Sequence, residues 1–110
     1  MSDTLSRLTP LQFLVLGLLL AQEQPGRNLR SQAAEYGLRR SAPAFYQMMA
    51  RLERDQLVDG WYEPVTVGDQ AMRERWYCVT PEGRKQWKHA RAFYRLIEMK
   101  AAGERLSNAS

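Results

Sequence analysis

Hydrophobic residues dominate the first predicted helix of the chain. Thr9, Pro10 and Gln12 are typical of a helix start, with Thr9 as N-cap, a proline in the first turn and Gln12 closing a capping box. The apolar run that follows reaches Ala21, and apolar residues occupy both sides of this helix. Such a helix has to be covered on both sides, and a second subunit is one way to cover it.

Two further helices are predicted after this one. Asn28 is a suitable N-cap for a short helix from Leu29 to Tyr36, and Gly37 stands where a helix commonly ends. The segment before it, 22–27, contains proline and glycine and has the composition of a loop. A third helix is predicted from Ser41 to about Gln56, because apolar residues recur three and four apart along it.

Residues that favour β-structure replace the helical pattern in the next part of the chain. Two stretches, 58–67 and 72–79, are rich in aromatic and β-branched residues and are separated by a turn-like sequence. They predict a two-stranded hairpin, in which Pro64 marks an edge strand or an early end to pairing, because proline donates no hydrogen bond to a ladder. We expect the hairpin aromatic residues to form the floor of the core, with stacking on single-stranded bases as the alternative. These aromatic residues are Trp61, Tyr62, Trp76 and Tyr77.

A long helix is predicted from Pro81 to about Arg105, because Thr80 and Pro81 repeat the earlier helix-start signature. Its apolar residues alternate three and four apart, which is typical of a helix that packs along another helix. We therefore expect a two-fold dimer in which this helix packs on the partner's last and first helices. The alternative is that it folds back on its own domain. The expected interface residues are Leu16, Leu20, Trp87, Ala90, Tyr94, Ile97 and Ala101.

The order of these elements is that of a winged helix. It predicts an α+β fold, mostly α: a winged helix-turn-helix of three helices and a β-hairpin wing, followed by a long C-terminal dimerisation helix. We expect residues 1–80 to form a winged-helix DNA-binding domain and residues 81–110 to form the dimerisation helix and tail, as one structural unit. In this arrangement the third helix enters the major groove of DNA and the hairpin lies along phosphates.

Polar and basic residues cluster where that arrangement would place DNA. With the small residues between them, the predicted DNA-binding residues are Arg39, Arg40, Ser41, Pro43, Ala44, Tyr46, Gln47, Arg51, Arg73 and Arg75. Arginine suits phosphate or guanine, Gln47 can pair with adenine, and Ala44 is small enough to let the helix approach the bases. Arg73 and Arg75 lie two apart on a predicted strand and so project from one face. The alternatives are that individual arginines only solubilise the surface and that Tyr46 packs on the second helix.

The charge of the chain supports a polyanionic partner. The chain has 16 Lys and Arg against 12 Asp and Glu, a net charge of +4. Residues 70–95 alone hold seven basic residues and two acidic ones. The basic face of the last helix, from Arg84 to Arg95, either widens a DNA-facing surface or is simply solvated. Double-stranded DNA is therefore the expected partner.

Enzymatic and membrane functions are disfavoured by the sequence. The single cysteine, Cys78, cannot form a disulfide within the chain, and together with the single histidine, His89, it cannot build a four-ligand zinc site. His89 lacks a nucleophile and a carboxylate at triad spacing, and no glycine-rich phosphate loop is present. The longest apolar run has about 11 residues, against roughly 17 to 25 for a membrane-spanning helix. We expect a cytoplasmic protein without metal or cofactor that is not an enzyme.

Four local matches resemble the PadR-type winged-helix transcriptional regulators, in particular the short members with a single C-terminal helix. The matches are residues 8–19, Ala44-Phe45-Tyr46 followed by Arg51-Leu52-Glu53, Arg75-Trp76-Tyr77, and Val79-Thr80-Pro81-Glu82-Gly83. Their order and spacing cover about residues 9 to 90. The resemblance implies a homodimeric bacterial repressor that binds a roughly palindromic operator and is often released by a small aromatic or hydrophobic effector.

The resemblance also implies roles for individual residues. Tyr46 matches a family tyrosine near the DNA backbone, and residues 41–47 match the DNA-reading end. Trp87 stands on the helix where multidrug-sensing relatives have a pore-lining tryptophan, so it is a candidate for an effector pocket, with core or interface packing as the alternative. The glycine and threonine usual before the tyrosine are Pro43-Ala44 here, and the glycine usual after the third helix is Gln56.

Three function classes follow from these observations, the third being an enzyme or a single-strand nucleic-acid binder. The first is a sequence-specific DNA-binding transcriptional regulator. The second is a winged-helix module that binds other proteins without reading DNA. The second class would show little salt dependence and no preference between DNA sequences.

Overall fold

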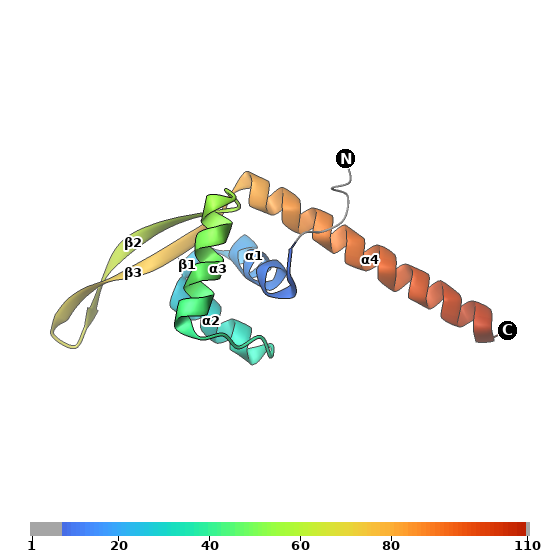
Figure 1. Cartoon of the computed structure of the whole chain (residues 1–110), viewed down its shortest axis with the longest axis horizontal. Coiled ribbons are helices and arrows are strands. Elements are labelled where there is room, and N and C mark those ends of the chain that lie inside the picture. Colours follow the sequence, from blue (N-terminus) through green and yellow to red (C-terminus); the bar gives the residue numbers. More distant parts are fainter. Residues whose placement is uncertain (1–7, 110) are drawn as a thin grey trace.

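The computed structural model describes residues 8–109 and the side chains of residues 8–103. Residues 1–7 and 110, which are the outer ends of the two expected domains, lie outside it. Within this part the elements follow the order α1 (Pro10–Ala21), β1 (Gln24–Pro25), α2 (Gly26–Glu35), α3 (Ala42–Arg54), β2 (Val58–Val67), β3 (Gln70–Val79) and α4 (Pro81–Ala109). The first three helices and the base of the sheet form a body (Figure 1). The hairpin extends from one side of this body and α4 from the other, over a length of 67 Å. This is the predicted winged helix with a long C-terminal helix.

Helix α1 begins with the expected capping box and lies at the centre of the core. The Gln12 backbone N–H donates to Thr9 Oγ1 at 3.1 Å, and the Thr9 N–H donates to Gln12 Oε1 at 3.0 Å. Its buried residues are Leu11, Val15, Leu16 and Leu19. Helix α1 contacts α2, β3 and α4, so elements of the same chain provide much of the cover that its apolar surface requires.

The segment 22–27 is not only a loop, as its composition had indicated. Gln24 and Pro25 form the short strand β1, in which Gln24 pairs with Tyr77 of β3. Helix α2 then begins at Gly26, before the predicted Asn28 cap, because Pro25 already has the extended backbone of an N-cap residue. The end of α2 is as predicted: Gly37 has a φ of 84°, and hydrogen bonds from its N–H and that of the next residue close the last turn.

Helix α3 has the predicted cap and a well-defined buried face. Ser41 Oγ accepts a hydrogen bond from the Ala44 N–H at 3.3 Å. The helix ends at Arg54, slightly before the predicted end. Gln56 has a φ of 64° and takes the left-handed position that a glycine usually occupies after a helix. The Leu57 N–H returns to the Leu52 carbonyl at 2.9 Å, so the chain turns sharply from α3 into β2.

The sheet has the order β1-β3-β2, so β2 is an edge strand, and its pairing continues past Pro64 to Val67 instead of ending early. Strand β3 starts two residues earlier than predicted, because a tight turn lets Val67 pair with Gln70. Of the four hairpin aromatic residues only Tyr77 is buried. Tyr62 is 54% exposed, so the expectation that it forms the floor of the core is wrong. The physical reason is that the hairpin projects beyond the body (Figure 1).

A tightly packed corner joins α4 to the rest of the fold. Thr80 Oγ1 accepts from the Gly83 N–H at 2.9 Å, which caps α4, and donates to the Gln56 carbonyl at 2.7 Å. Gly83 lies against the Leu57 carbonyl, and a Cβ at this position would collide with that oxygen. The inner part of α4 packs on α1, and its outer part extends away from the body (Figure 1).

Candidate nucleic-acid interface

The outer face of α3 presents most of the residues that were predicted to read DNA. Phe45, Met49 and Leu52 are buried, which fixes the rotation of the helix. The opposite side of the helix is exposed, and its predicted residues are Ser41, Pro43, Ala44, Gln47 and Arg51. No hydrogen bond or ion pair within the described part of the chain occupies the side chains of Gln47 and Arg51. These side chains are free to meet a partner.

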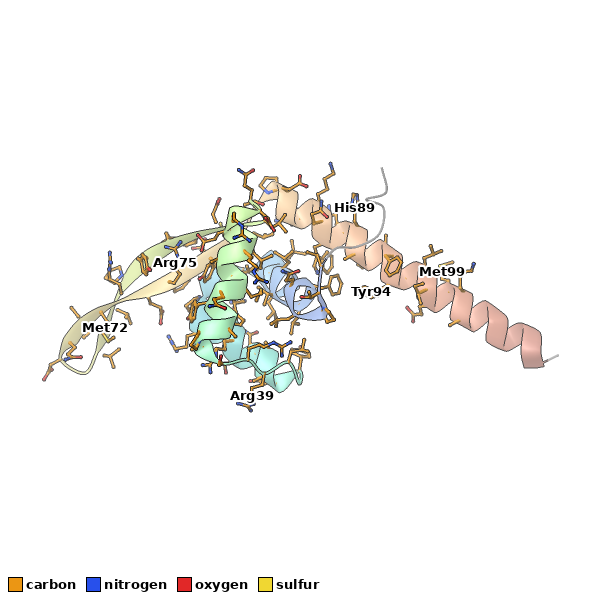
Figure 2. The ribbon with its side chains drawn as sticks, in the orientation of Figure 1. Arg39, Met72, Arg75, His89, Tyr94 and Met99 are labelled. Atoms are coloured by element: carbon orange, nitrogen blue, oxygen red, sulfur yellow. The ribbon has the colours of Figure 1, made fainter. Side chains whose placement is uncertain are left out.

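A cluster of arginines adjoins the N-terminal end of this face. Arg39 and Arg40 lie in the connection before α3, and both are exposed. Arg30 Nε donates to the Arg40 carbonyl at 2.9 Å, which fixes the connection against α2. Arg39, Arg40, Arg30 and Arg27 all line one open hollow of about 430 Å³. Figure 2 shows Arg39 at the edge of the body, near the α2–α3 connection.

Arg27 and Arg30 were missed as candidates in the sequence. They lie three residues apart on α2, so they share a face of the helix. The signal was present in this spacing, but α2 was expected to begin only after Arg27. The cluster therefore contains two arginines from the predicted set and two from outside it.

Tyr46 lies between α2 and α3 on the side that faces the hairpin. A Cβ at Gly26 would come within 2.7 Å of the Tyr46 ring and 2.9 Å of its hydroxyl oxygen, so the tyrosine packs closely on the start of α2. Its ring also meets Phe45 edge to face at 5.7 Å. Burial raises the pKa of the Tyr46 hydroxyl, with Glu74 adding to the rise and Arg30 opposing it. The hydroxyl therefore stays protonated at neutral pH and can donate a hydrogen bond.

The two wing arginines share a face, as predicted, but have different surroundings. The guanidinium carbon of Arg73 lies 4.6 Å from the Tyr62 ring centroid and that of Arg75 lies 4.7 Å from it. Arg75 also forms an ion pair with Glu53, with Nη2 and Oε1 2.6 Å apart. Arg73 is exposed and has no carboxylate partner in the described part of the chain. Only Arg73 is thus available without breaking an existing ion pair.

An open groove of about 800 Å³ separates α3 from the hairpin. Its floor and walls combine aromatic, aliphatic and charged side chains, including Tyr46, Ala50, Tyr62, Val65 and Arg73. Arg27 crosses one end of the groove and pairs with Glu74 of β3 at 2.8 Å. The groove therefore connects the arginine cluster with the wing.

Solved structures with this fold are found among bacterial regulators. No protein-family model matches the sequence, and no curated protein does either. A PadR family transcriptional regulator from Eggerthella lenta has a TM-score of 0.65 and 26% identity, covering 87% of this chain and 80% of its own. A PadR family transcription regulator from Clostridium difficile has a TM-score of 0.73 and 19% identity, covering 89% of this chain and 99% of its own. A PadR-like regulator from Bacillus cereus has a TM-score of 0.70 and 17% identity, covering 84% and 88% of the two chains.

The chain has the winged-helix fold of these PadR-family regulators. These three structural relatives are described as transcriptional regulators. Within residues 8–109, no cluster of three or more histidine, cysteine or acidic residues could hold a metal ion. No helix in the same part of the chain is long and apolar enough to cross a membrane.

In this PadR-like chain, Trp87 packs inside the protomer. Phe13 stacks on its ring at 5.4 Å with an interplanar angle of 7°, and the Arg91 guanidinium lies 5.3 Å from its centroid. Its indole nitrogen approaches Gly17 so closely that a Cβ at Gly17 would lie 2.9 Å from it. A role of Trp87 in an effector pocket stays a prediction, and it would require this packing to change.

The predicted dimer residues divide into two groups. Leu16 and Ala90 are fully buried in the PadR-like chain's own core, so they have no surface left for a partner and their expected role is corrected. Helical periodicity alone did not reveal that Ala90 faces α1 of the same chain. The second group, Leu20, Trp87, Tyr94, Ile97 and Ala101, keeps exposed or partly exposed surface.

Cys78 and His89 lie away from the arginine cluster. Cys78 is half-buried on β3, and burial raises the pKa of its thiol, with Asp59 adding to the rise. His89 is exposed on α4, as Figure 2 shows, beside a shallow hollow lined by Arg84, Lys85 and Lys88. Neither residue has the surroundings of a catalytic nucleophile or base.

Proposed function

We propose that this protein is a sequence-specific DNA-binding transcriptional regulator. The observation that carries the proposal is the exposed N-terminal face of α3, which is bordered by Arg30, Arg39 and Arg40 on one side and by Arg73 on the other. Cations beside an exposed helix face suit the phosphates that border a major groove. The PadR-family relatives support the same function.

In this proposal, α3 provides base contacts and its surroundings provide phosphate contacts. Gln47 has the donor and acceptor pair that matches the edge of adenine, and Ala44 leaves room for close approach. Arg40, Arg51 and Arg73 would bind phosphates and fix the helix in the groove. The neutral Tyr46 hydroxyl would donate one further hydrogen bond to the backbone.

The active form would be a homodimer. Tyr94, Leu96, Ile97 and Met99 are between 42% and 69% exposed on the outer part of α4, and this apolar surface suits a second copy of the helix. Two-fold symmetry would place two α3 helices in successive major grooves, about 34 Å apart, on a palindromic operator. Residues 1–80 would then bind DNA and residues 81–110 would join the protomers.

The regulatory outcome belongs to the same proposal. We propose repression in the cytoplasm, relieved by a small aromatic or hydrophobic effector that binds near Trp87, as the family resemblance implies. A ligand of this kind would have to displace Phe13 or Arg91 from the tryptophan ring. Quenching of tryptophan fluorescence by such a ligand, lost in Trp87→Phe, would support this site.

Binding to labelled duplexes tests the central proposal. Duplexes selected by the wild-type protein from a random pool are compared with scrambled ones by fluorescence anisotropy at several salt concentrations. Gln47→Ala should lower operator affinity by about 1 to 3 kcal/mol and relax the preference for one base position. Arg40→Ala should weaken binding to all duplexes and reduce the salt slope by about one.

A matched control separates α3 from the basic face of α4. Arg95→Gln removes one positive charge from α4 and should leave both the operator preference and the salt slope unchanged. A loss as large as that of Arg40→Ala would instead extend the DNA-binding surface to α4. Equal and weak binding of the wild type to all duplexes would favour the protein-interaction module.

A further inference from the structure

A compact group of charged and aromatic side chains joins α3 to the hairpin. Glu53 lies seven residues after Tyr46, so both face the hairpin from the same side of α3. Glu53 Oε1 accepts from Arg75 Nη2 at 2.6 Å, and the two side chains are only 27% and 26% exposed. The ion pair thus spans the two elements that border the groove.

Aromatic rings hold the guanidinium of Arg75 in place. Its carbon lies 4.7 Å from the Tyr62 centroid and 6.0 Å from the Tyr77 centroid. Tyr77 is buried, and Tyr62 lies directly opposite Arg75 in the register of β2 and β3. Cation–π contacts of this kind strengthen when the cation is partly removed from water.

Gly60 provides the space that the ion pair occupies. A Cβ on Gly60 would lie 3.0 Å from Arg75 Nη2 and 3.0 Å from the Glu53 carboxyl carbon. A side chain at this position would have to push one of the partners away. Three elements, α3, β2 and β3, therefore contribute to one contact.

The two wing arginines therefore differ in what they can do. Arg73 has no carboxylate partner among the described residues, so it can reach a phosphate without losing one. Arg75 can do so only by leaving Glu53 and abandoning a charge-assisted hydrogen bond. Figure 2 shows Arg75 where the hairpin leaves the body and Met72 further towards its tip.

We infer that the Glu53–Arg75 pair fixes the angle of the hairpin relative to α3, and that Arg75 is a positioning residue of the DNA interface. The inference rests on the proposed function, and it assigns the phosphate contact of the wing to Arg73. Because the hairpin extends far from the body, a small rotation at its base displaces its tip strongly. Together with the Arg27–Glu74 ion pair from α2, this pair therefore helps to set how the wing and α3 can bind the same duplex.

The direction in which Glu53→Gln changes the affinity for DNA distinguishes this assignment from direct phosphate binding by Arg75. Glu53→Gln removes a negative charge near DNA and frees Arg75, so simple electrostatics predicts tighter binding. A positioning role predicts the reverse: operator affinity falls by about 3- to 10-fold, the scale of one ordinary hydrogen bond, while the salt slope stays at the wild-type value. Arg73→Gln should lower affinity and reduce the salt slope by about one.

Two further variants make the test specific. Asp69→Asn removes a carboxylate from the turn of the same hairpin, where it has no ion pair among the described residues, and should tighten binding slightly. Gly60→Ala crowds the ion pair from β2 and should reproduce the loss seen with Glu53→Gln. Tighter binding and a steeper salt slope in Glu53→Gln, as in Asp69→Asn, would overturn the inference.

A measurement without DNA separates this inference from the proposed function. Hydrogen–deuterium exchange of the amides in 58–79 should become faster in Glu53→Gln and Gly60→Ala and stay unchanged in Asp69→Asn. Unchanged exchange in all three variants would show that the pair does not hold the hairpin. If the two variants exchange faster but the wild-type protein prefers no DNA sequence, the ion pair does hold the hairpin and the proposed DNA-binding function is rejected.

Discussion

The body of the protein and the outer part of α4 use similar apolar patterns for different purposes. In the body, Val15, Leu29, Phe45 and Met49 leave no exposed surface. On α4, Ile97 continues a helical repeat but is 50% exposed. The body buries its pattern within one chain, whereas the outer part of α4 leaves its pattern exposed, and in the proposed dimer a second copy would cover it. Apolar periodicity thus predicts that a face will be covered, but not which chain covers it.

The largest expected effect is on the stability of the body. Phe45→Ala removes a fully buried ring from the face of α3 that packs on the core and should lower the free energy of unfolding by about 3 to 5 kcal/mol. Urea unfolding followed by circular dichroism measures this loss. Gln47→Ala, on the exposed face of the same helix, is the control and should change the value by less than about 0.5 kcal/mol.

The next effect concerns assembly and should leave the body intact. Ile97→Asp places a charge in the expected dimer surface and should weaken dimerisation by at least about 30-fold, the equivalent of roughly 2 kcal/mol. Light scattering across a concentration series gives the dissociation constant. A variant that stays dimeric, or a wild type that is monomeric at micromolar concentration, contradicts the assignment of this surface.

Alkaline pH should weaken the body through Tyr77. Burial raises the pKa of its hydroxyl from 10.0 to about 12, with Glu53 adding to the rise and Arg75 opposing it. Since the folded state holds this proton more tightly than the unfolded state, its contribution is complete below pH 10 and is lost as the pH rises through about 12. Urea unfolding between pH 9 and pH 12 should show this decline, and Tyr77→Phe should make it shallower.

The smallest effect concerns the end of α3. Gln56 has a positive φ of 64°, which glycine adopts without the steric cost of a Cβ. Gln56→Gly should therefore raise the free energy of unfolding by about 0.5 to 1 kcal/mol. Gly37→Ala, at the corresponding position after α2 with a φ of 84°, should have the opposite sign. Thermal unfolding of both variants makes the comparison.

Most of the fold was predictable from the sequence because the long elements carry their own signals. The caps at Thr9 and Ser41 and the break at Gly37 mark helix ends locally. Strand β1 could not be predicted, because two residues show no periodicity and the strand exists only through pairing with β3. The early start of α2 was missed because Asn28 is the residue with a side chain suited to an N-cap, whereas Pro25 makes no side-chain cap hydrogen bond.

The candidate site was predicted in part. Exposure of Gln47 and Arg51 follows from the spacing of the buried residues on α3. The ion pair of Arg75 could not be inferred, because Glu53 precedes it by 22 residues and only the hairpin geometry brings them together. Likewise, a repeat along α4 does not indicate that Ala90 faces α1 of its own chain.

The corner formed by Thr80, Gly83 and Leu57 has a consequence for how such a regulator diversifies. In the proposed dimer, this corner transmits the position of α4 to the end of α3 and so sets the separation of the two half-sites. The residues that would read bases lie on another face of α3. Operator spacing and base preference would then depend on different surfaces, so substitutions on that outer face would change the target sequence while the spacing stayed the same.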